Sequence, residues 1–299
     1  MIYFYATLIA VGYGGLHFVS RFGSRYDFKV SPDGVQYLAA GQGRHVPLPY
    51  NLRWMAPRLF RDRLLLWCLA SWVSMAVLGP LAAWYFEGDW AIKLFAAALV
   101  VGLPGIVRIN IAMPVLSDST AIAAMLAGAA CFKRGYFWVG LGLAGLSATF
   151  REAAPIFMAL AAWSPWPLAG LAAVLLRYLQ VRRWTDAEHV PAMFSEKGAE
   201  AVATKRLHGL DGNKGIWFRG AVMLMPWGIC LLAVLNPSWQ LGLSLLAGYG
   251  QLIPASDKVR LYQWAFPAVV AAVLPSVPKK WMLAAVLFHW WHPWNVYSF

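Results

Sequence analysis

Charged residues are scarce in this chain. Only 13% of its 299 residues are Asp, Glu, Lys or Arg, whereas an ordinary soluble domain carries roughly 25%. Hydrophobic residues make up 60%, and the mean hydropathy is +0.56. This composition excludes a water-soluble fold and predicts an all-α polytopic membrane protein, because such a length divides naturally into bilayer-spanning helices of about 20 residues.

The fingerprints of several enzyme classes are also missing. The sequence has no P-loop, no Gly-rich nucleotide-binding motif and no nucleophile elbow. Its three cysteines, Cys68, Cys131 and Cys230, lie in apolar runs without a partner at zinc-ligand spacing. The histidines form no metal-ligand spacing either. No basic segment precedes the apolar start, so we expect the first segment to remain as a helix and not to be cleaved as a signal peptide.

Apolar runs predict about ten or eleven transmembrane helices in one domain, residues 1–299. The runs lie near residues 2–20, 64–86, 91–108, 119–132, 136–150, 153–164, 166–180, 216–235, 239–254, 262–277 and 280–292. Because 153–164 and 166–180 are short and separated by Ser-Pro-Trp-Pro, one or both are expected to be tilted or re-entrant. Many tryptophans fall at the ends of runs, which is typical of the aromatic belt at a membrane interface.

Two connections are long enough to carry structure of their own. In residues 21–63, basic and apolar residues interleave, as in the stretch from Arg53 to Arg61. This pattern predicts interfacial helices in the first large loop, with a solvated loop as the alternative. Residues 179–215 are rich in charge and are predicted to form a polar loop.

If the spans alternate, most charges fall on one side of the membrane. The opposite side receives only the basic residues Lys93, Lys133, Arg134, Lys279 and Lys280 and the acidic residues Glu87 and Asp89. Ionisable groups near hydrocarbon are costly unless they pair or line a wet cavity, so the charged side is expected to hold the functional site. The basic residues favour membrane lipid and its phosphate groups over nucleic acid as a partner. Their excess also predicts that this side is cytoplasmic.

Four positions on that side are candidates for function. Asp33 lies in a Ser-Pro-Asp-Gly turn, and Asp118 begins a helix, where a plain N-cap is the alternative. The pair Arg151-Glu152 interrupts an apolar stretch, with a structural ion pair as its alternative. Asp257 and Arg260 are three residues apart and share a helix face if a helix forms there.

These stretches resemble the type C (GT-C) superfamily of integral-membrane glycosyltransferases, which use polyprenyl-phosphate-linked sugars. The resemblance is carried by residues 33–39, 49–57, Asp118, 150–152 and 257–260. Proteins of this superfamily carry an acidic residue in the first large extracytoplasmic loop, then a Pro-aromatic-x-x-Arg stretch, then an Arg-Glu pair at the end of a middle helix. The resemblance implies a GT-C-like fold in an integral membrane protein, expected in a bacterial inner membrane. It also implies a site on the outer face of the membrane, whereas the excess of basic residues predicts that the same side is cytoplasmic.

The resemblance also implies roles for single residues. Asp33 and Asp118 would be the catalytic carboxylates, Arg53, Arg151 and Arg260 would bind the donor phosphate, and Tyr37, Glu152 and Asp257 would support them. In this interpretation Glu152 orients Arg151, and a divalent metal ion between Asp33 and Asp118 is an open alternative. The chemistry is reasonable, because displacing a lipid phosphate from a sugar needs a carboxylate near the acceptor hydroxyl and cations at the leaving phosphate.

Two other functions stay open. A transporter or flippase-like protein would use the same arginines to bind an anionic head group, although the paired halves typical of transporters are not visible. A non-catalytic membrane protein could bind anionic lipid through its basic face. The carboxylates Asp33 and Asp118 favour catalysis, because a surface that binds anionic lipid has no need of them.

Overall fold

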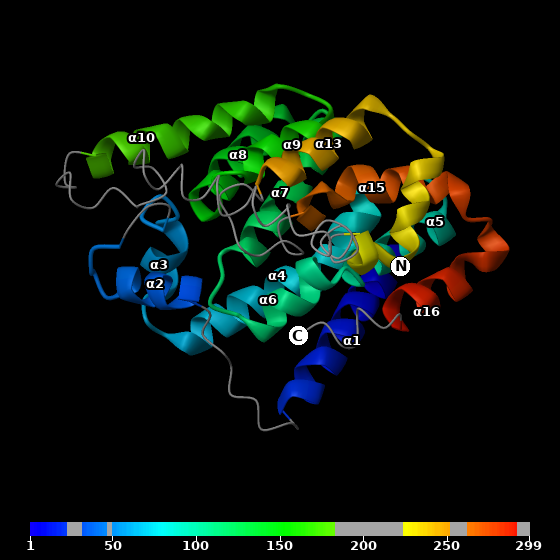
Figure 1. Ribbon diagram of the computed structural model, residues 1–299, viewed down its shortest axis with the longest axis horizontal. Coiled ribbons are helices and arrows are strands. Elements are labelled where there is room, and N and C mark those ends of the chain that lie inside the picture. Colours follow the sequence, from blue (N-terminus) through cyan, green and yellow to red (C-terminus); the bar gives the residue numbers. More distant parts are fainter. Residues whose placement is uncertain (23–31, 47–49, 183–223, 252–261, 292–299) are drawn as a thin grey trace, which may run out of the picture.

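A computed structural model describes residues 1–22, 32–46, 50–182, 224–251 and 262–291. Within these ranges every regular element is a helix and no strand occurs (Figure 1). The predicted all-helical fold is therefore confirmed for this part of the chain.

The helices follow the apolar runs but are mostly shorter. The first half contains α1 (Ile2–Phe22), α2 (Pro32–Gly41), α3 (Met55–Phe60), α4 (Leu64–Tyr85), α5 (Trp90–Val101), the π-helical turn η1 (Pro104–Arg108), α6 (Ile109–Ala112), α7 (Asp118–Lys133) and α8 (Phe137–Phe150). The second half contains α9 (Ala154–Ala162), η2 (Trp166–Gly170), α10 (Leu171–Arg182), η4 (Met225–Leu235), α13 (Trp239–Gly250), η5 (Gln263–Ala265), α15 (Phe266–Val273), η6 (Leu274–Ser276), η7 (Lys279–Trp281) and α16 (Met282–Trp291).

One helix of the described residues, α4, is long and apolar enough to cross a membrane by itself. Two bent pairs raise the number to three if each pair is one span: α5 with residues 104–112, bent by 59°, and residues 263–276 with 279–291, bent by 112°. A proline lies at each break: Pro104 begins the segment after the first break, and Pro278 lies within the second. Proline lacks a backbone donor and disfavours helix in the residue before it. The first break divides the predicted run at 91–108, whereas the second falls between the predicted runs at 262–277 and 280–292. Among the described residues, one to three helices or bent pairs could cross a membrane, fewer than the ten or eleven spans predicted from the sequence.

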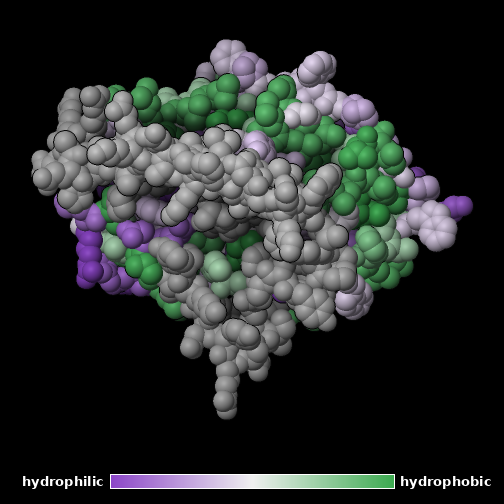
Figure 2. Space-filling view, viewed as in Figure 1, coloured by the Kyte–Doolittle hydropathy of each residue, from purple (hydrophilic) through white to green (hydrophobic). Residues whose placement is uncertain are grey.

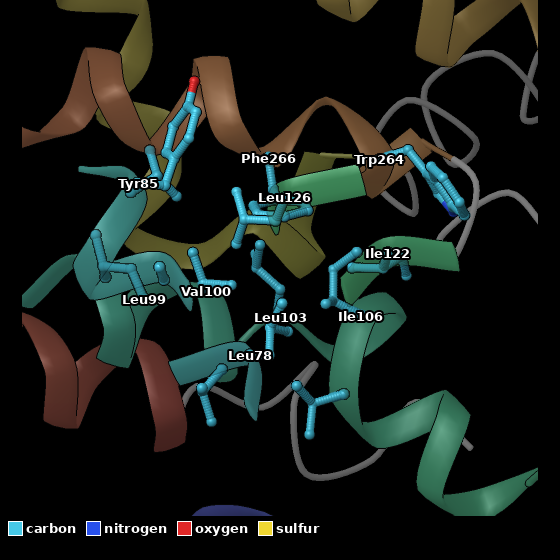
Figure 3. Packing of buried hydrophobic residues seen from close by; sticks show 14 of the residues in the cluster. Leu78, Tyr85, Leu99, Val100, Leu103, Ile106, Ile122, Leu126, Trp264 and Phe266 are labelled. Atoms are coloured by element: carbon cyan, nitrogen blue, oxygen red, sulfur yellow. The ribbon is translucent and has the colours of Figure 1, made fainter. Parts of the chain in front are cut away.

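The core is formed by α4, α5, α7 and α15. Leu78, Leu99, Leu126 and Phe266 lie within it and are almost fully buried (Figure 3). Helix α1 packs closely on α4 at Gly79, where a Cβ atom would lie only 2.2 Å from the backbone oxygen of Ala6. Small residues at such a crossing let two helix backbones approach, as membrane helices commonly do.

The connections that carry few charges in the sequence meet at one end of the helices. Asp89, before α5, forms an ion pair with Lys279. Lys133, at the end of α7, lies 4.2 Å from the centre of the Tyr85 ring at the end of α4. Asp118 begins α7 and therefore lies at the opposite end of the helices from Lys133. Helices α2 and α3 and the end of α8 lie at this same end.

Candidate functional site

The site begins at the first turn of α2, where Asp33 is half-buried. The hydroxyl of Tyr50 donates a hydrogen bond to Asp33 Oδ1 over 2.7 Å. Burial, together with this bond to a carboxylate, raises the pKa of Tyr50 above its usual value. Tyr50 therefore stays protonated and keeps donating to Asp33.

Arg53 lies three residues after Tyr50 and is only 4% exposed. Its Nε and Nη2 donate to the two carboxylate oxygens of Glu152 over 2.7 and 2.5 Å, and its Nη1 donates to the Tyr37 hydroxyl over 2.7 Å. This is the bidentate arrangement in which arginine binds a carboxylate most strongly. Burial acts to raise the pKa of Glu152, but the charge and hydrogen bonds of Arg53 lower it to about 2. The pair is therefore charged at neutral pH.

A second ion pair is more deeply buried. Arg151 Nη1 lies 2.8 Å from Asp118 Oδ1, and the two side chains are 6% and 1% exposed. Ser117, just before Asp118, makes no capping bond and instead donates to the Tyr37 hydroxyl over 3.3 Å. Tyr37 thus accepts hydrogen bonds from both Arg53 and Ser117.

The pairing corrects one prediction. Glu152 binds Arg53 and not Arg151, whose partner is Asp118. Arg151 ends α8 with an extended backbone, φ −150° and ψ 119°, and successive side chains in an extended segment point to opposite sides. Neighbours in the sequence such as Arg151 and Glu152 therefore reach different partners.

Six of the eight residues predicted for the site lie in one network. We call this network the polar cluster; it consists of Asp33, Tyr37, Tyr50, Arg53, Ser117, Asp118, Arg151 and Glu152. Electrostatic interactions of Asp118 with Arg53 and of Arg151 with Glu152 connect its two ion pairs. The remaining predicted residues, Asp257 and Arg260, lie outside the described residues, as do residues 183–215 of the polar loop.

The two described arginines predicted to bind phosphate are already engaged. Arg53 and Arg151 each form an ion pair with a carboxylate and are nearly inaccessible. A phosphate at either guanidinium would have to displace Glu152 or Asp118, leaving a carboxylate without its cation. Both arginines are therefore bound in ion pairs within the cluster and are not available to bind an anion.

The described residues do not fit a divalent metal ion between Asp33 and Asp118. No three His, Cys, Asp or Glu side chains converge anywhere within the described ranges. Hard cations take about six oxygen ligands, whereas Asp33 is bound by Tyr50 and Asp118 by Arg151. The guanidinium beside Asp118 would also repel a cation.

Sequence reasoning gave no role to Tyr50, Ser117 or Asn51. Tyr50 is the aromatic residue of the Pro-aromatic-x-x-Arg stretch, and this position, three residues before Arg53, could have indicated that it belongs to the site. The backbone oxygen of Asn51 accepts a bond of 3.1 Å from Arg177 Nε of α10, more than a hundred residues away. The turn at residues 50–53 therefore binds three separate parts of the chain: Asp33, Arg177 and Glu152.

Geometry and residue chemistry define the candidate site, a half-buried carboxylate beside two buried ion pairs at one end of the helices. Compared with protein-family models, curated proteins and solved structures, the chain has no significant match.

Proposed function

We propose that this chain is a polytopic integral membrane protein, of the bacterial inner membrane, that transfers a sugar from a polyprenyl-phosphate donor to an acceptor hydroxyl at the membrane surface. The GT-C resemblance supplies the donor class. The polar cluster supplies the chemistry, and the apolar surface supports the membrane location.

Outward-facing apolar side chains support a lipid environment. Leu176 of α10 is 63% exposed and Leu283 of α16 is 72% exposed, and Trp239, Leu246 and Trp291 are similarly accessible. Soluble monomers rarely expose apolar side chains over several adjoining helices, because the hydrophobic effect drives such surfaces out of water. In a bilayer these helices would contact acyl chains.

The position of Asp33 is the observation that carries the proposed catalytic role. Of the two carboxylates expected to be catalytic, Asp118 is buried against Arg151, whereas Asp33 is half-buried at the edge of the polar cluster. An acceptor hydroxyl can reach only a carboxylate that is accessible. Asp33 is therefore the base in this proposal, and Asp118 is a positioning residue that acts through Arg151.

The reaction follows from this assignment. Asp33 takes the proton of the acceptor hydroxyl while the hydroxyl oxygen bonds to the anomeric carbon of the sugar. The bond between that carbon and the phosphate oxygen breaks, and its electron pair leaves with polyprenyl phosphate. Tyr50 holds the Asp33 carboxylate in place through its 2.7 Å hydrogen bond.

Asp33→Asn tests the role of Asp33. The full chain in proteoliposomes is given radiolabelled polyprenyl-phosphate sugars and a set of acceptors, and we expect the substitution to lower transfer by about 10²- to 10⁴-fold, the usual contribution of a general base. Asp62→Asn, an exposed carboxylate in the same loop, is the matched control and should keep full activity. Circular dichroism checks that both variants are folded.

Retained turnover in the Asp33→Asn variant would remove Asp33 from the mechanism. The same vesicles distinguish the transport alternative. If the wild-type chain moves the labelled lipid between leaflets without transferring its sugar, the protein is flippase-like and the transferase proposal is wrong.

A further inference from the structure

Beside the polar cluster, two arginines have no carboxylate partner among the described residues: Arg58 of α3 and Arg177 of α10. Arg177 Nε donates to the Asn51 backbone oxygen over 3.1 Å, and its Nη1 lies 3.5 Å from Gln180 Oε1. The Arg58 guanidinium lies 5.8 Å from the centre of the Trp54 ring. Both cationic groups are thus held in place by neutral partners, unlike Arg53 and Arg151.

Both arginines contact the chain at one turn of the backbone, residues 50–53, or directly after it. Asn51, which holds Arg177, and Trp54, which holds Arg58, are separated by a turn in which the Arg53 amide donates to the Tyr50 oxygen over 3.2 Å. Burial and the positive charge of Arg58 both lower the pKa of Arg177. Bringing like charges together costs free energy, and a shared anion would offset that cost.

Phosphate is the anion that matches this pair. The planar fork of arginine binds two phosphate oxygens at once, and its charge is permanent. Arg58 is exposed and Arg177 is half-buried, so an anion can reach both. Figure 2 shows hydrophilic side chains gathered at the end of the molecule where Figure 1 places α2 and α3.

The surroundings favour a phosphate attached to a lipid. Leu59, next to Arg58, is 56% exposed, and Leu175 and Leu176, just before Arg177, are 57% and 63% exposed. Exposed leucines therefore lie on the same two helices as the arginines, where a hydrocarbon chain can contact them. Free phosphate would gain nothing from these leucines.

We propose that Arg58 and Arg177 together bind the phosphate group of an anionic, lipid-linked substrate. This inference rests on the proposed function, since it assigns the phosphate site of that donor. The same turn connects the two sites, because Tyr50 binds Asp33 and Asn51 binds Arg177. A phosphate at the arginine pair would thus be held by the same turn that positions the base.

The experiment measures binding directly and does not depend on turnover. The full chain in maltoside detergent is titrated with dodecyl phosphate by isothermal calorimetry, and inorganic phosphate is titrated in parallel. We expect Arg58→Gln and Arg177→Gln each to weaken dodecyl phosphate binding about tenfold or more, the usual effect of losing a charge-assisted hydrogen bond. Arg58→Lys and Arg177→Lys should weaken it less, because they keep the charge and lose the fork.

Arg44→Gln is the matched control, since Arg44 is an exposed arginine of the same loop and its loss changes the net charge equally. We expect this control to stay within about twofold of the wild type, because an exposed charge that does not contact the phosphate is screened by salt. If the Arg58 and Arg177 variants behave like the control while melting normally, the arginine pair is not the site. If inorganic phosphate binds as tightly as dodecyl phosphate, the lipid chain plays no part and the inference of a lipid-linked ligand is wrong.

The two proposals fail separately. Asp33→Asn should abolish sugar transfer and leave dodecyl phosphate binding unchanged. If Asp33→Asn retains transfer while the arginine variants lose binding, the catalytic assignment is wrong and the phosphate site stands. If Asp33→Asn loses transfer while the arginine variants bind normally, the arginine pair is not the phosphate site and the catalytic assignment of Asp33 stands.

Discussion

Replacing Glu152 by Gln tests whether the polar cluster stabilises the fold. The substitution keeps the shape of the side chain but removes the charge that faces Arg53, which is 4% exposed and would remain a cation. Removing one partner of a buried ion pair typically costs 3–5 kcal/mol. Since the Glu152 side chain is 30% exposed, water can partly replace it, and we expect a loss of about 3 kcal/mol, the lower end of that range.

The assay is unfolding of the full chain in mixed micelles by titration with sodium dodecyl sulfate at neutral pH, repeated at lower pH in a non-ionic denaturing mixture. The pKa of Glu152 is about 2 in the folded protein and 4.5 in its ordinary state. A carboxylate with a lowered folded pKa contributes stability that is complete above the ordinary pKa and is lost as the pH falls towards the folded value. The difference between wild type and Glu152→Gln should therefore shrink between about pH 4.5 and pH 2.

Glu87→Gln is the control, because Glu87 is an exposed glutamate at the other end of the helices. It should leave unfolding unchanged. A loss of less than about 0.5 kcal/mol at pH 7, the range of ordinary surface substitutions, would show that the ion pair does not stabilise the fold. A stability difference between wild type and Glu152→Gln that is as large near pH 2 as at pH 7 would show the same.

Two further predictions concern packing and the second ion pair. Asp118→Asn leaves the buried Arg151 cation without its carboxylate and should destabilise the fold by about 3–5 kcal/mol in the same titration. The double variant Asp118→Asn with Arg151→Met should recover much of that loss, because it also removes the unpaired cation. A double variant as unstable as Asp118→Asn alone would contradict the pairing. Gly79→Ala places a Cβ atom 2.2 Å from the Ala6 oxygen and should cost about 1–3 kcal/mol. Gly142→Ala, in α8 where the space is open, should be neutral or stabilise by up to about 1 kcal/mol; equal effects at the two glycines would contradict the close approach of α1 to α4.

The helices were predictable from the sequence, but their lengths were not. An apolar run indicates a helix whether its side chains face the protein interior or lipid. The runs at 2–20 and 64–86 accordingly correspond to α1 and α4. A hydropathy pattern is insensitive to bends, and the run at 91–108 contains Gly102 and Pro104, where the helix turns by 59°. Proline explains this break once the structure is known, but its presence does not predict one. Pro80, for example, lies inside α4 and does not end the helix.

The charged residues of the polar cluster and Tyr37 were predictable, but Tyr50, Ser117 and the pairing of the charges were not. Charges that interrupt apolar stretches are costly unless they meet a partner, and this argument selected Asp33, Asp118 and Arg151. Partner choice depends on the direction of each side chain, and Arg53 reaches Glu152 across 99 residues of sequence. Arg58 and Arg177 were missed because arginines without a carboxylate partner can be recognised only when the positions of all nearby carboxylates are known.

The turn at residues 50–53 has a consequence for how the chain is made. Its contacts with Glu152 and Arg177 span 99 and 126 residues, so neither partner exists when the turn is first synthesised. Until α8 and α10 have emerged, the guanidinium of Arg53 must remain hydrated, because an arginine cannot enter hydrocarbon unpaired without a large penalty. The final shape of the first loop is therefore acquired late, and any truncation before α8 would leave that loop without the contacts that fix it.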